Sequence, residues 1–326
     1  MKLPKYLSPS SRSLFYTDRR EYYLKYLADE RPPRMPQTKP MSVGSSFDAY
    51  IKSYLHKRLF GVVEPKYELD TLLKSQVESQ NLDWAIDAGK ICFEQYKESG
   101  AIADLMIELE KAIDDPRFEF KVEGRLLHED IIDGIPIVGY PDLYFKLDNE
   151  AHVIYDFKVN GFCAKSNTSP KPGYIMCRDG WAGKQSRSHR TSHKNAHISN
   201  YGGIKINVAG HFESVDDSWA AQLTTYGWLE GVSVGDKMIA GIEQLACSPG
   251  PKIRVASHRG LVSKPYQLQL LGTYAYQWKT IHSGHIFDDL TREESDQMCA
   301  TLDDIHKAYN GDNPIEKWFT NSTRQH

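Results

Sequence analysis

One segment, GYPDLYFKLDNEAHVIYDFK at residues 139–158, most constrains what this chain can fold into. Its runs LYF at 143–145 and VIY at 153–155 are aliphatic and aromatic, which favours two strands. The letters DNE at 148–150 are typical of a turn between them. We therefore expect two neighbouring strands of one sheet, and this sheet has to accommodate the charged residues of the segment.

Three of these charged residues are predicted to meet on one face of the sheet. Side chains alternate across a strand, so Asp156 and Lys158 share a face, and Asp142 can meet them there from the neighbouring strand. Buried charges are costly unless they are paired or bound to a metal. Carboxylates are preferred ligands of Mg²⁺ and Mn²⁺, and a lysine can stabilise phosphoryl charge. The pattern favours a metal site, although an Asp156–Lys158 surface pair on an edge strand has the same spacing.

The composition is that of an ordinary globular protein. The chain has 326 residues, of which 40% are hydrophobic and 25% charged, and its net charge is −3. This is enough apolar material for a large core in one or two domains. No apolar run is long enough to cross a bilayer, and residues 1–6 lack the apolar segment of a signal peptide. We expect a cytoplasmic protein without a membrane partner, whose five irregularly spaced cysteines are reduced: Cys92, Cys163, Cys177, Cys247 and Cys299.

The pattern of the chain changes near Pro116. Before it, apolar residues at helical spacing predict helices over 8–27 and 42–59 and a helical region over 69–114. After it, short runs of strand-forming residues predict an antiparallel meander up to residue 159, and a helix is expected from Ser214. Two further strands and two helices follow. The expected fold is α/β or α+β, with a helical region over 1–115 packed on a core domain over 116–326.

A basic insertion over 160–213 separates the second strand from the helix at Ser214. It has little periodicity, so we expect a long functional loop. Between Gly161 and His211, Asp179 is the one acid, against eight basic residues: Lys165, Lys171, Arg178, Lys184, Arg187, Arg190, Lys194 and Lys205. Such a loop is suited to contacts with nucleic-acid phosphates, for which the candidates are Lys184, Arg187, Arg190 and Lys194. The alternative is a zinc site, with candidate ligands Cys163, Cys177, His189, His193 and His197.

Several short motifs occur in the order of a known family. Gln222 and Tyr226 are four apart on the predicted helix and share one face. The letters GYPD at 139–142, DFK at 156–158 and QLTTY at 222–226 resemble the G-x-x-D, D/E-x-K and Q-x-x-x-Y motifs of PD-(D/E)XK nucleases, in the RecB-like, phage-type exonuclease branch. Residues 7–27 and 43–51 resemble the two opening helices of the same family.

The resemblance implies a fold, an activity and a set of roles. The fold would be a restriction-endonuclease-like core, a central mixed β-sheet flanked by helices, with an N-terminal helical elaboration. The activity would be that of a Mg²⁺- or Mn²⁺-dependent deoxyribonuclease, an exonuclease of DNA recombination, repair or phage DNA processing. Asp142, Asp156 and the carbonyl of Phe157 would ligate the metal, and Lys158 would assist the attacking water. Gln222 and Tyr226 would position the phosphate backbone or the lysine.

The chain departs from the family pattern at two places. Asp48 stands where the family has histidine, and it is expected either to reach the metal or to pair with Lys52 on the helix surface. Relatives with an iron–sulfur cluster have a cysteine where this chain has Thr17–Asp18, so we predict no cluster. Glu123 stands where the family often has an acid on its first strand.

DNA is the expected partner, either single- or double-stranded, together with a recombination or replication protein. If the gene is carried by a phage, the host cytoplasm is the expected location. The alternative function is a non-catalytic nucleic-acid-binding module that retains the nuclease fold. The intact set of Asp142, Asp156 and Lys158 weighs against this alternative, since a module without turnover has no need to hold these charges together.

Overall fold

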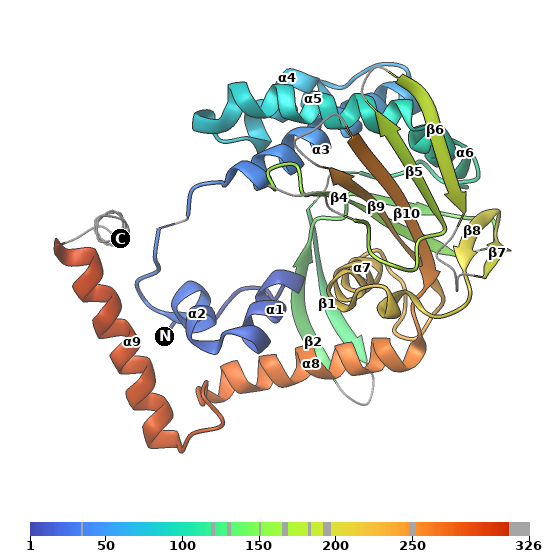
Figure 1. The fold of residues 1–326 in the computed structure, drawn as a ribbon. Coiled ribbons are helices and arrows are strands. Elements are labelled where there is room, and N and C mark those ends of the chain that lie inside the picture. Colours follow the sequence, from blue (N-terminus) through green and yellow to red (C-terminus); the bar gives the residue numbers. More distant parts are fainter. Residues whose placement is uncertain are drawn as a thin grey trace. The chain divides into compact units, whose positions relative to one another are not determined.

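A computed structural model describes residues 1–33, 35–118, 121–128, 132–149, 151–164, 169–181, 184–191, 197–247 and 252–312. Figure 1 shows a chain that mixes helices and strands. Its internal contacts divide it into two compact units: Met1–Met35, Glu123–Val138 and Leu268–His326 in the first, and Pro36–Val122 and Gly139–Gln267 in the second. No helix within the described ranges combines the length and the apolar character needed to cross a membrane.

These units do not follow the expected division into 1–115 and 116–326. That division follows the order of the chain, whereas the helices between residues 39 and 109 belong to the same unit as the large sheet formed after residue 139. The physical reason is that these helices bury their apolar faces against that sheet. A change of pattern along the sequence therefore marks a change of element type here and not a boundary between units.

The first unit consists mainly of helices. Its elements are α1 (Pro9–Thr17), α2 (Arg19–Tyr22), a π-helical turn (Tyr23–Leu27), β1 (Val122–His128), β2 (Ile132–Gly139), α8 (Lys264–Ser283) and α9 (Arg292–Asp312). Of these, β1, β2 and α8 each have one end in the second unit. The single helix expected over 8–27 is wrong. It breaks at Asp18, whose extended backbone (φ −148°, ψ 95°) lets the carboxylate accept a hydrogen bond from Glu21 N at 2.9 Å and cap α2.

The second unit holds the large sheet and five helices among its described residues. The helices are α3 (Lys39–Phe60), α4 (Leu69–Gln76), α5 (Leu82–Glu98), α6 (Ala101–Leu109) and α7 (Asp217–Leu229), with 3₁₀ turns at Pro65–Tyr67, Ser79–Asn81 and Phe212–Ser214. The strands are β3 (Leu143–Lys146), β4 (His152–Asn160), β5 (Met176–Trp181), β6 (Lys184–Thr191), β7 (Ile198–Tyr201), β8 (Ile204–Asn207), β9 (Met238–Cys247) and β10 (Lys252–Leu261).

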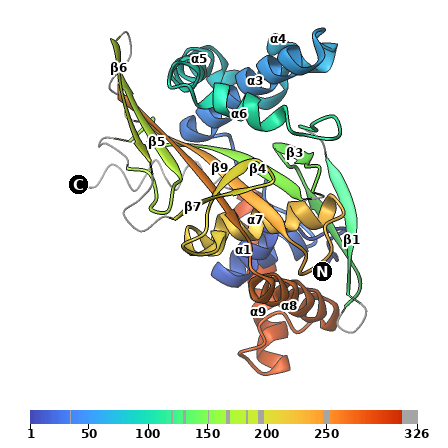
Figure 2. The same ribbon diagram turned by 90° about the vertical axis from the view of Figure 1, so that its right-hand side faces the viewer.

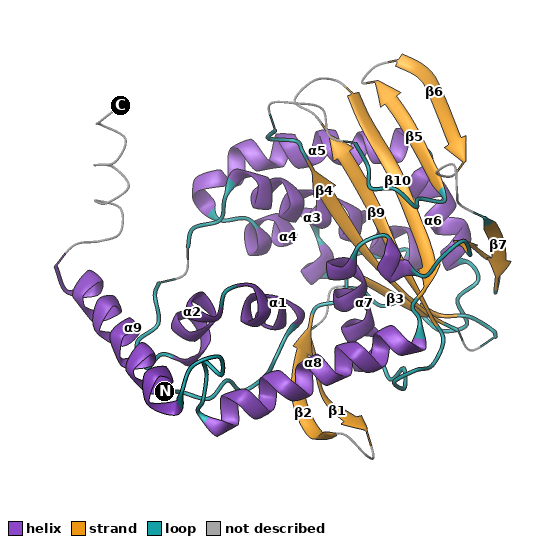
Figure 3. Cartoon of the chain, turned by 60° about the horizontal axis from the view of Figure 1, so that its bottom comes forward, coloured by secondary structure: helices purple, strands orange, loops and turns teal. Residues whose placement is uncertain are grey.

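The large sheet is mixed, with strand order β3-β4-β9-β10-β5-β6 (Figure 3). Strands β4 and β9 are parallel, and the other described pairs are antiparallel. The expected mixed sheet flanked by helices is thus present. The expected meander is wrong in part, because β1 and β2 form a two-stranded sheet of their own and only β3 and β4 enter the large sheet.

The basic segment over 160–213 is not one long loop. It contributes β5 and β6 to the edge of the large sheet and β7 and β8 to a separate hairpin. The sequence conceals β5 because one of its buried residues is Arg178, whose guanidinium pairs with Asp104 of α6. A buried arginine removes the alternation of apolar and polar residues that identifies a strand. Pairing with β10, much later in the chain, specifies this strand.

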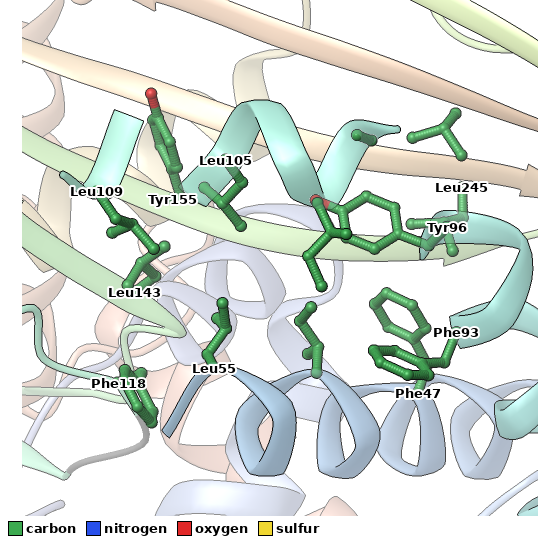
Figure 4. Close-up of a cluster of buried hydrophobic side chains, with 14 of the residues drawn as sticks. Phe47, Leu55, Phe93, Tyr96, Leu105, Leu109, Phe118, Leu143, Tyr155 and Leu245 are labelled. Carbon is green, nitrogen blue, oxygen red and sulfur yellow. The ribbon is translucent and has the colours of Figure 1, made fainter. Parts of the chain in front are cut away.

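The two faces of the sheet carry different helices. In β4, Val153 and Tyr155 belong to a core cluster with α3, α4, α5 and α6, part of which Figure 4 shows. Ile154 belongs to a second cluster, formed with Leu223 and Tyr226 of α7. Figure 2 shows α3, α5 and α6 on one side of the sheet and α7 on the other. Because side chains alternate along β4, residues of even number in this strand face α7.

The pairing of β4 with β9 requires a glycine at position 241. Tyr155 lies opposite Gly241, and a Cβ at Gly241 would overlap the tyrosine ring. The Arg259 guanidinium lies 3.8 Å from the centroid of the same ring, on which it stacks. The ring is therefore held between the glycine and the arginine and has no room to move away.

Gly241→Ala should lower the free energy of unfolding by about 1–3 kcal/mol, the usual range for overpacking a dense core. Urea denaturation measures this change. Gly44→Ala is the control, because no heavy atom lies within 4 Å of a Cβ at this position of α3. Alanine there should leave stability equal or raise it by up to about 1 kcal/mol. Equal stability of the Gly241 variant and the wild type would contradict the described packing.

Candidate active site

The helix α7 and the strand β4 bring four polar side chains into one hydrogen-bonded network. Gln222 Nε2 donates to Asp156 Oδ1 and to Tyr226 Oη, both at 3.0 Å. Lys158 Nζ donates to Gln222 Oε1 at 3.1 Å and forms an ion pair with Asp156 Oδ2. The prediction that Gln222 and Tyr226 share a helix face is confirmed, and so is the prediction that Asp156 and Lys158 share a strand face.

Helix α7 begins slightly later than expected. Ser214 lies in a 3₁₀ turn, and the residue that caps α7 is Asp216, whose Oδ1 accepts a hydrogen bond from Trp219 N at 2.8 Å. An aspartate at this position is well suited to the free N–H groups and the positive end of a helix. The cap fixes where the helix starts and therefore which of its residues face β4.

Asp142 joins this network from the residue before β3. Phe157 N donates to Asp142 Oδ2 at 3.1 Å, which places the Asp142 carboxylate beside the β4 backbone between Asp156 and Lys158. The expected meeting of Asp142 with these two residues is therefore confirmed. The side chain of Phe157 packs in the core against Phe47, with ring centroids 5.9 Å apart.

Helix α3 adds two residues to the cluster, and one of them was not expected there. Lys52 Nζ lies 2.6 Å from Asp48 Oδ2 and 3.7 Å from Asp142 Oδ1. Lys52 is only 5% exposed, so the idea of an Asp48–Lys52 pair on the helix surface is wrong. The sequence held one signal for this: Asp48 and Lys52 are the only charged residues between positions 40 and 55 of a helix with a buried apolar stripe.

The burial of Asp156 controls the electrostatics of the cluster. The residue is 3% exposed, and this burial, together with the nearby carboxylate of Asp142, raises the pKa of Asp156 to about 7. Burial alone would lower the pKa of Lys158, but Asp156 and Asp142 outweigh it, so the pKa of the lysine is raised. At neutral pH Lys158 is therefore an ammonium ion, and Asp156 is in part protonated.

The cluster has an inner and an outer part. Asp156 and Lys52 are buried, whereas the side chains of Asp142 and Lys158 are 21% and 26% exposed. A solute that approaches the cluster meets the carboxylates of Asp142 and Asp48, the latter with a side chain 19% exposed, and the ammonium group of Lys158. Behind them lie the carboxylate of Asp156 and the ammonium group of Lys52, both shielded from water and therefore stronger in their electrostatic effect.

Gly139 allows the chain to pass closely beneath α7. A Cβ at this position would lie 2.7 Å from the Tyr226 ring and 2.7 Å from Leu229 Cδ1. A side chain here would displace Tyr226 and, through it, Gln222. The glycine of the G-x-x-D motif thus has a packing role in this chain, because it lets the segment that carries Asp142 lie against the helix that carries the glutamine.

The donor atoms of the cluster fit Mg²⁺ or Mn²⁺. These ions, Mg²⁺ above all, are commonly held by one or two carboxylates and keep several water ligands. Asp142 and Asp156 supply two carboxylates. Burial, and after it the charge of Asp142, raises the pKa of Asp156, and a bound cation would stabilise the ionised form against both effects. Asp48 is held by Lys52 instead. Within the described ranges, no three His, Cys, Asp or Glu side chains gather as a metal-binding group.

Other sequence candidates lie elsewhere. Glu123 belongs to the first unit, where its carboxylate accepts a hydrogen bond from the Tyr6 hydroxyl. Three of the basic candidates (Lys184, Arg187 and Arg190) lie on β6, but their side chains fall outside the described part of the structure, as does Lys194 entirely. Of the zinc candidates, Cys163 is exposed and Cys177 is buried, while the side chains of His189 and His193 are outside the described part.

Comparisons with known proteins identify no family for this chain. No family model matches it, and no curated protein matches it. Among solved structures, the chain is similar to one described as the crystal structure of SSO0001, with 11% identity, a TM-score of 0.25 and coverage of 81% of this chain and 84% of the other. A likeness at this level carries no argument about fold or activity.

The pKa of Asp156 predicts how stability depends on pH without metal. A carboxyl group has a pKa near 4 in the unfolded chain and about 7 here, so the folded chain binds an extra proton between these values. The free energy of unfolding should therefore fall as the pH rises from about 4 to about 7, by roughly 4 kcal/mol at most. The free energy of unfolding of Asp156→Asn should lack this fall with pH.

Urea denaturation of both proteins across this pH range, in the presence of a chelator, measures the difference. The free energy of unfolding of Asp156→Asn minus that of the wild type should increase between about pH 4 and about pH 7 and become constant above this range. Asp148→Asn, an exposed aspartate in the turn before β4, is the control and should follow the wild type. Parallel curves for Asp156→Asn and the wild type would show that Asp156 titrates normally.

Proposed function

We propose that this chain is a metal-dependent deoxyribonuclease with a restriction-endonuclease-like core, and that it hydrolyses phosphodiester bonds at the cluster of Asp142, Asp156 and Lys158. One observation carries the proposal. Two carboxylates, one of them buried with a raised pKa, lie beside an ammonium group that is partly open to solvent, and a glutamine from α7 links that ammonium to the buried carboxylate. Such groups suit the hydrolysis of an anionic ester.

Each residue has a role that follows from its position. Asp142, Asp156 and the carbonyl of Phe157 would hold the metal, which when bound supplies an activated water and neutralises phosphate charge. Lys158 stays protonated at neutral pH, so it stabilises the negative charge of the phosphoryl oxygens and does not act as a general base. Gln222 accepts from this ammonium and donates to Asp156, and so holds the two at a constant separation.

DNA is the proposed substrate on the basis of charge. The region over 160–213 follows β4 in the sequence and carries eight basic residues, four of which lie on β5 and β6. Basic side chains of this region would bind the DNA backbone without preference for sequence. Exonuclease action in recombination, repair or phage DNA processing, with a recombination or replication protein as partner, is the specific form of this proposal.

A non-catalytic nucleic-acid-binding module is the second candidate. It is favoured by the ion pair of Lys52 with Asp48 and by its approach to Asp142, because an ammonium group already balances these carboxylates without metal. Against it, the cluster keeps Asp142 and Lys158 accessible, whereas an ion pair that only stabilises a fold has no need of access.

Asp142→Asn and Asp156→Asn should each abolish cleavage of linear DNA in Mg²⁺ or Mn²⁺, because each removes a charged metal ligand. Gel electrophoresis of linear and circular DNA measures this and separates exonuclease from endonuclease action. Binding to DNA in Ca²⁺ should survive in both variants. Asp148→Asn should cleave like the wild type. A wild type that binds DNA and cuts neither form with either ion would favour the non-catalytic module.

Lys158→Met should lower kcat by about 100-fold or more and leave the affinity for DNA nearly unchanged, as expected for one lost contact to transition-state charge. Single-turnover kinetics gives the rate, and fluorescence anisotropy in Ca²⁺ gives the affinity. Lys146→Met, on the neighbouring strand β3, is the matched control and should keep both values. A variant that loses affinity but keeps its rate would assign Lys158 to substrate anchoring.

A further inference from the structure

Lys52 is buried among charged groups, unlike a lysine on the surface of a helix. It is 5% exposed, within the segment of α3 that packs on the sheet. Its ammonium lies between two carboxylates, 2.6 Å from Asp48 Oδ2 and 3.7 Å from Asp142 Oδ1. Taking an ammonium group out of water costs several kcal/mol, so these two carboxylates are what make its burial possible.

The position of this ammonium conflicts with the binding of a metal. Asp142 is one of the two carboxylates that would hold the cation, and one oxygen of Asp142 faces Lys52 while the other accepts from Phe157 N. A divalent ion at Asp142 would lie near the Lys52 ammonium, and two positive charges a few ångströms apart in a partly dry site repel strongly. Metal and Lys52 therefore compete for the charge of Asp142.

We propose that Lys52 is the built-in counter-ion of Asp48 and Asp142, and that a divalent cation binds only by displacing its ammonium from Asp142. This rests on the proposed function, because it takes the cluster to be the metal site. The lysine holds the carboxylates together when no metal is bound, and it lowers the affinity of the site for metal. Its role is to regulate metal occupancy, and it is a positioning residue for Asp142.

The test is the affinity of the full-length Lys52→Met protein for Mn²⁺, measured by isothermal titration calorimetry. Methionine keeps an unbranched chain of similar length and removes the charge. Its Kd for Mn²⁺ should be at least about tenfold lower than that of the wild type, because the competing cation is gone. Its melting temperature without metal should fall by several degrees, and Mn²⁺ should raise it by more than it raises that of the wild type.

The matched control is Lys74→Met. Lys74 and Asp70 of α4 form an ion pair with the same spacing in sequence and the same 2.6 Å distance, but their side chains are 65% and 76% exposed. Loss of that pair should change neither the Kd for Mn²⁺ nor the melting temperature appreciably. The comparison therefore separates the effect of a buried counter-ion from that of any i, i+4 pair.

Lys52→Gln, which keeps a hydrogen-bond donor for Asp48, replaces the methionine variant if the latter does not fold, with the same expected gain in affinity. An affinity for Mn²⁺ that is equal to or weaker than that of the wild type overturns the inference, as does an absence of Mn²⁺ binding to both proteins. The proposed nuclease is judged separately, by whether the wild type cuts DNA in Mn²⁺, so either idea can fail while the other stands.

Discussion

The parallel pairing of β4 with β9 is the constraint on which the candidate site depends. Parallel neighbours cannot be joined by a tight turn, so the chain has to cross over between them. This connection contains β5, β6, β7 and β8, and α7 is its last helix before β9. Burial of Ile154, Ile242 and Leu223 in one cluster then holds α7 on the face to which Asp156 points. Gln222 reaches Asp156 for this reason. A slip of one residue in β4 would turn Asp156 away from the helix.

Buried charge occurs on both faces of this sheet, with different consequences. On the face away from α7, Glu243 and Arg259 are buried and paired with each other, and Ser257 Oγ donates to Glu243 Oε2 at 3.1 Å. Both residues are closed to solvent, so this pair suits a role in the fold. On the face of α7, Asp142 and Lys158 remain partly exposed. Access, and not burial alone, distinguishes a candidate reactive cluster from a structural ion pair.

The two lysines of the site differ in the way that their elements hold them. Lys158 is held by a strand and by the amide of Gln222, and it stays at the outer edge of the cluster. Lys52 is held by a helix and by Asp48, in the interior. The same side-chain chemistry therefore serves two purposes in the proposed mechanism: the outer ammonium faces the substrate, and the inner one balances the carboxylates until a metal replaces it.

The amino-acid sequence by itself determined those features that depend on near neighbours in the chain. The strand period places Asp156 and Lys158 on one face, and the helix period places Gln222 and Tyr226 on another. Both follow from backbone geometry over a few residues, and both are present in the structure. The order of the motifs was likewise readable, since it requires no knowledge of which elements touch.

The tertiary structure alone decided which elements become neighbours. β5 joins the large sheet by pairing with β10, whereas β1 and β2 form a sheet of their own. Lys52, which was expected on the helix surface, is buried. Each outcome depends on a partner far away in the sequence, such as Asp104 for Arg178 or Asp142 for Lys52. Local propensity carries no information on such pairs, because their free energy arises only when distant segments bury charge and apolar surface together.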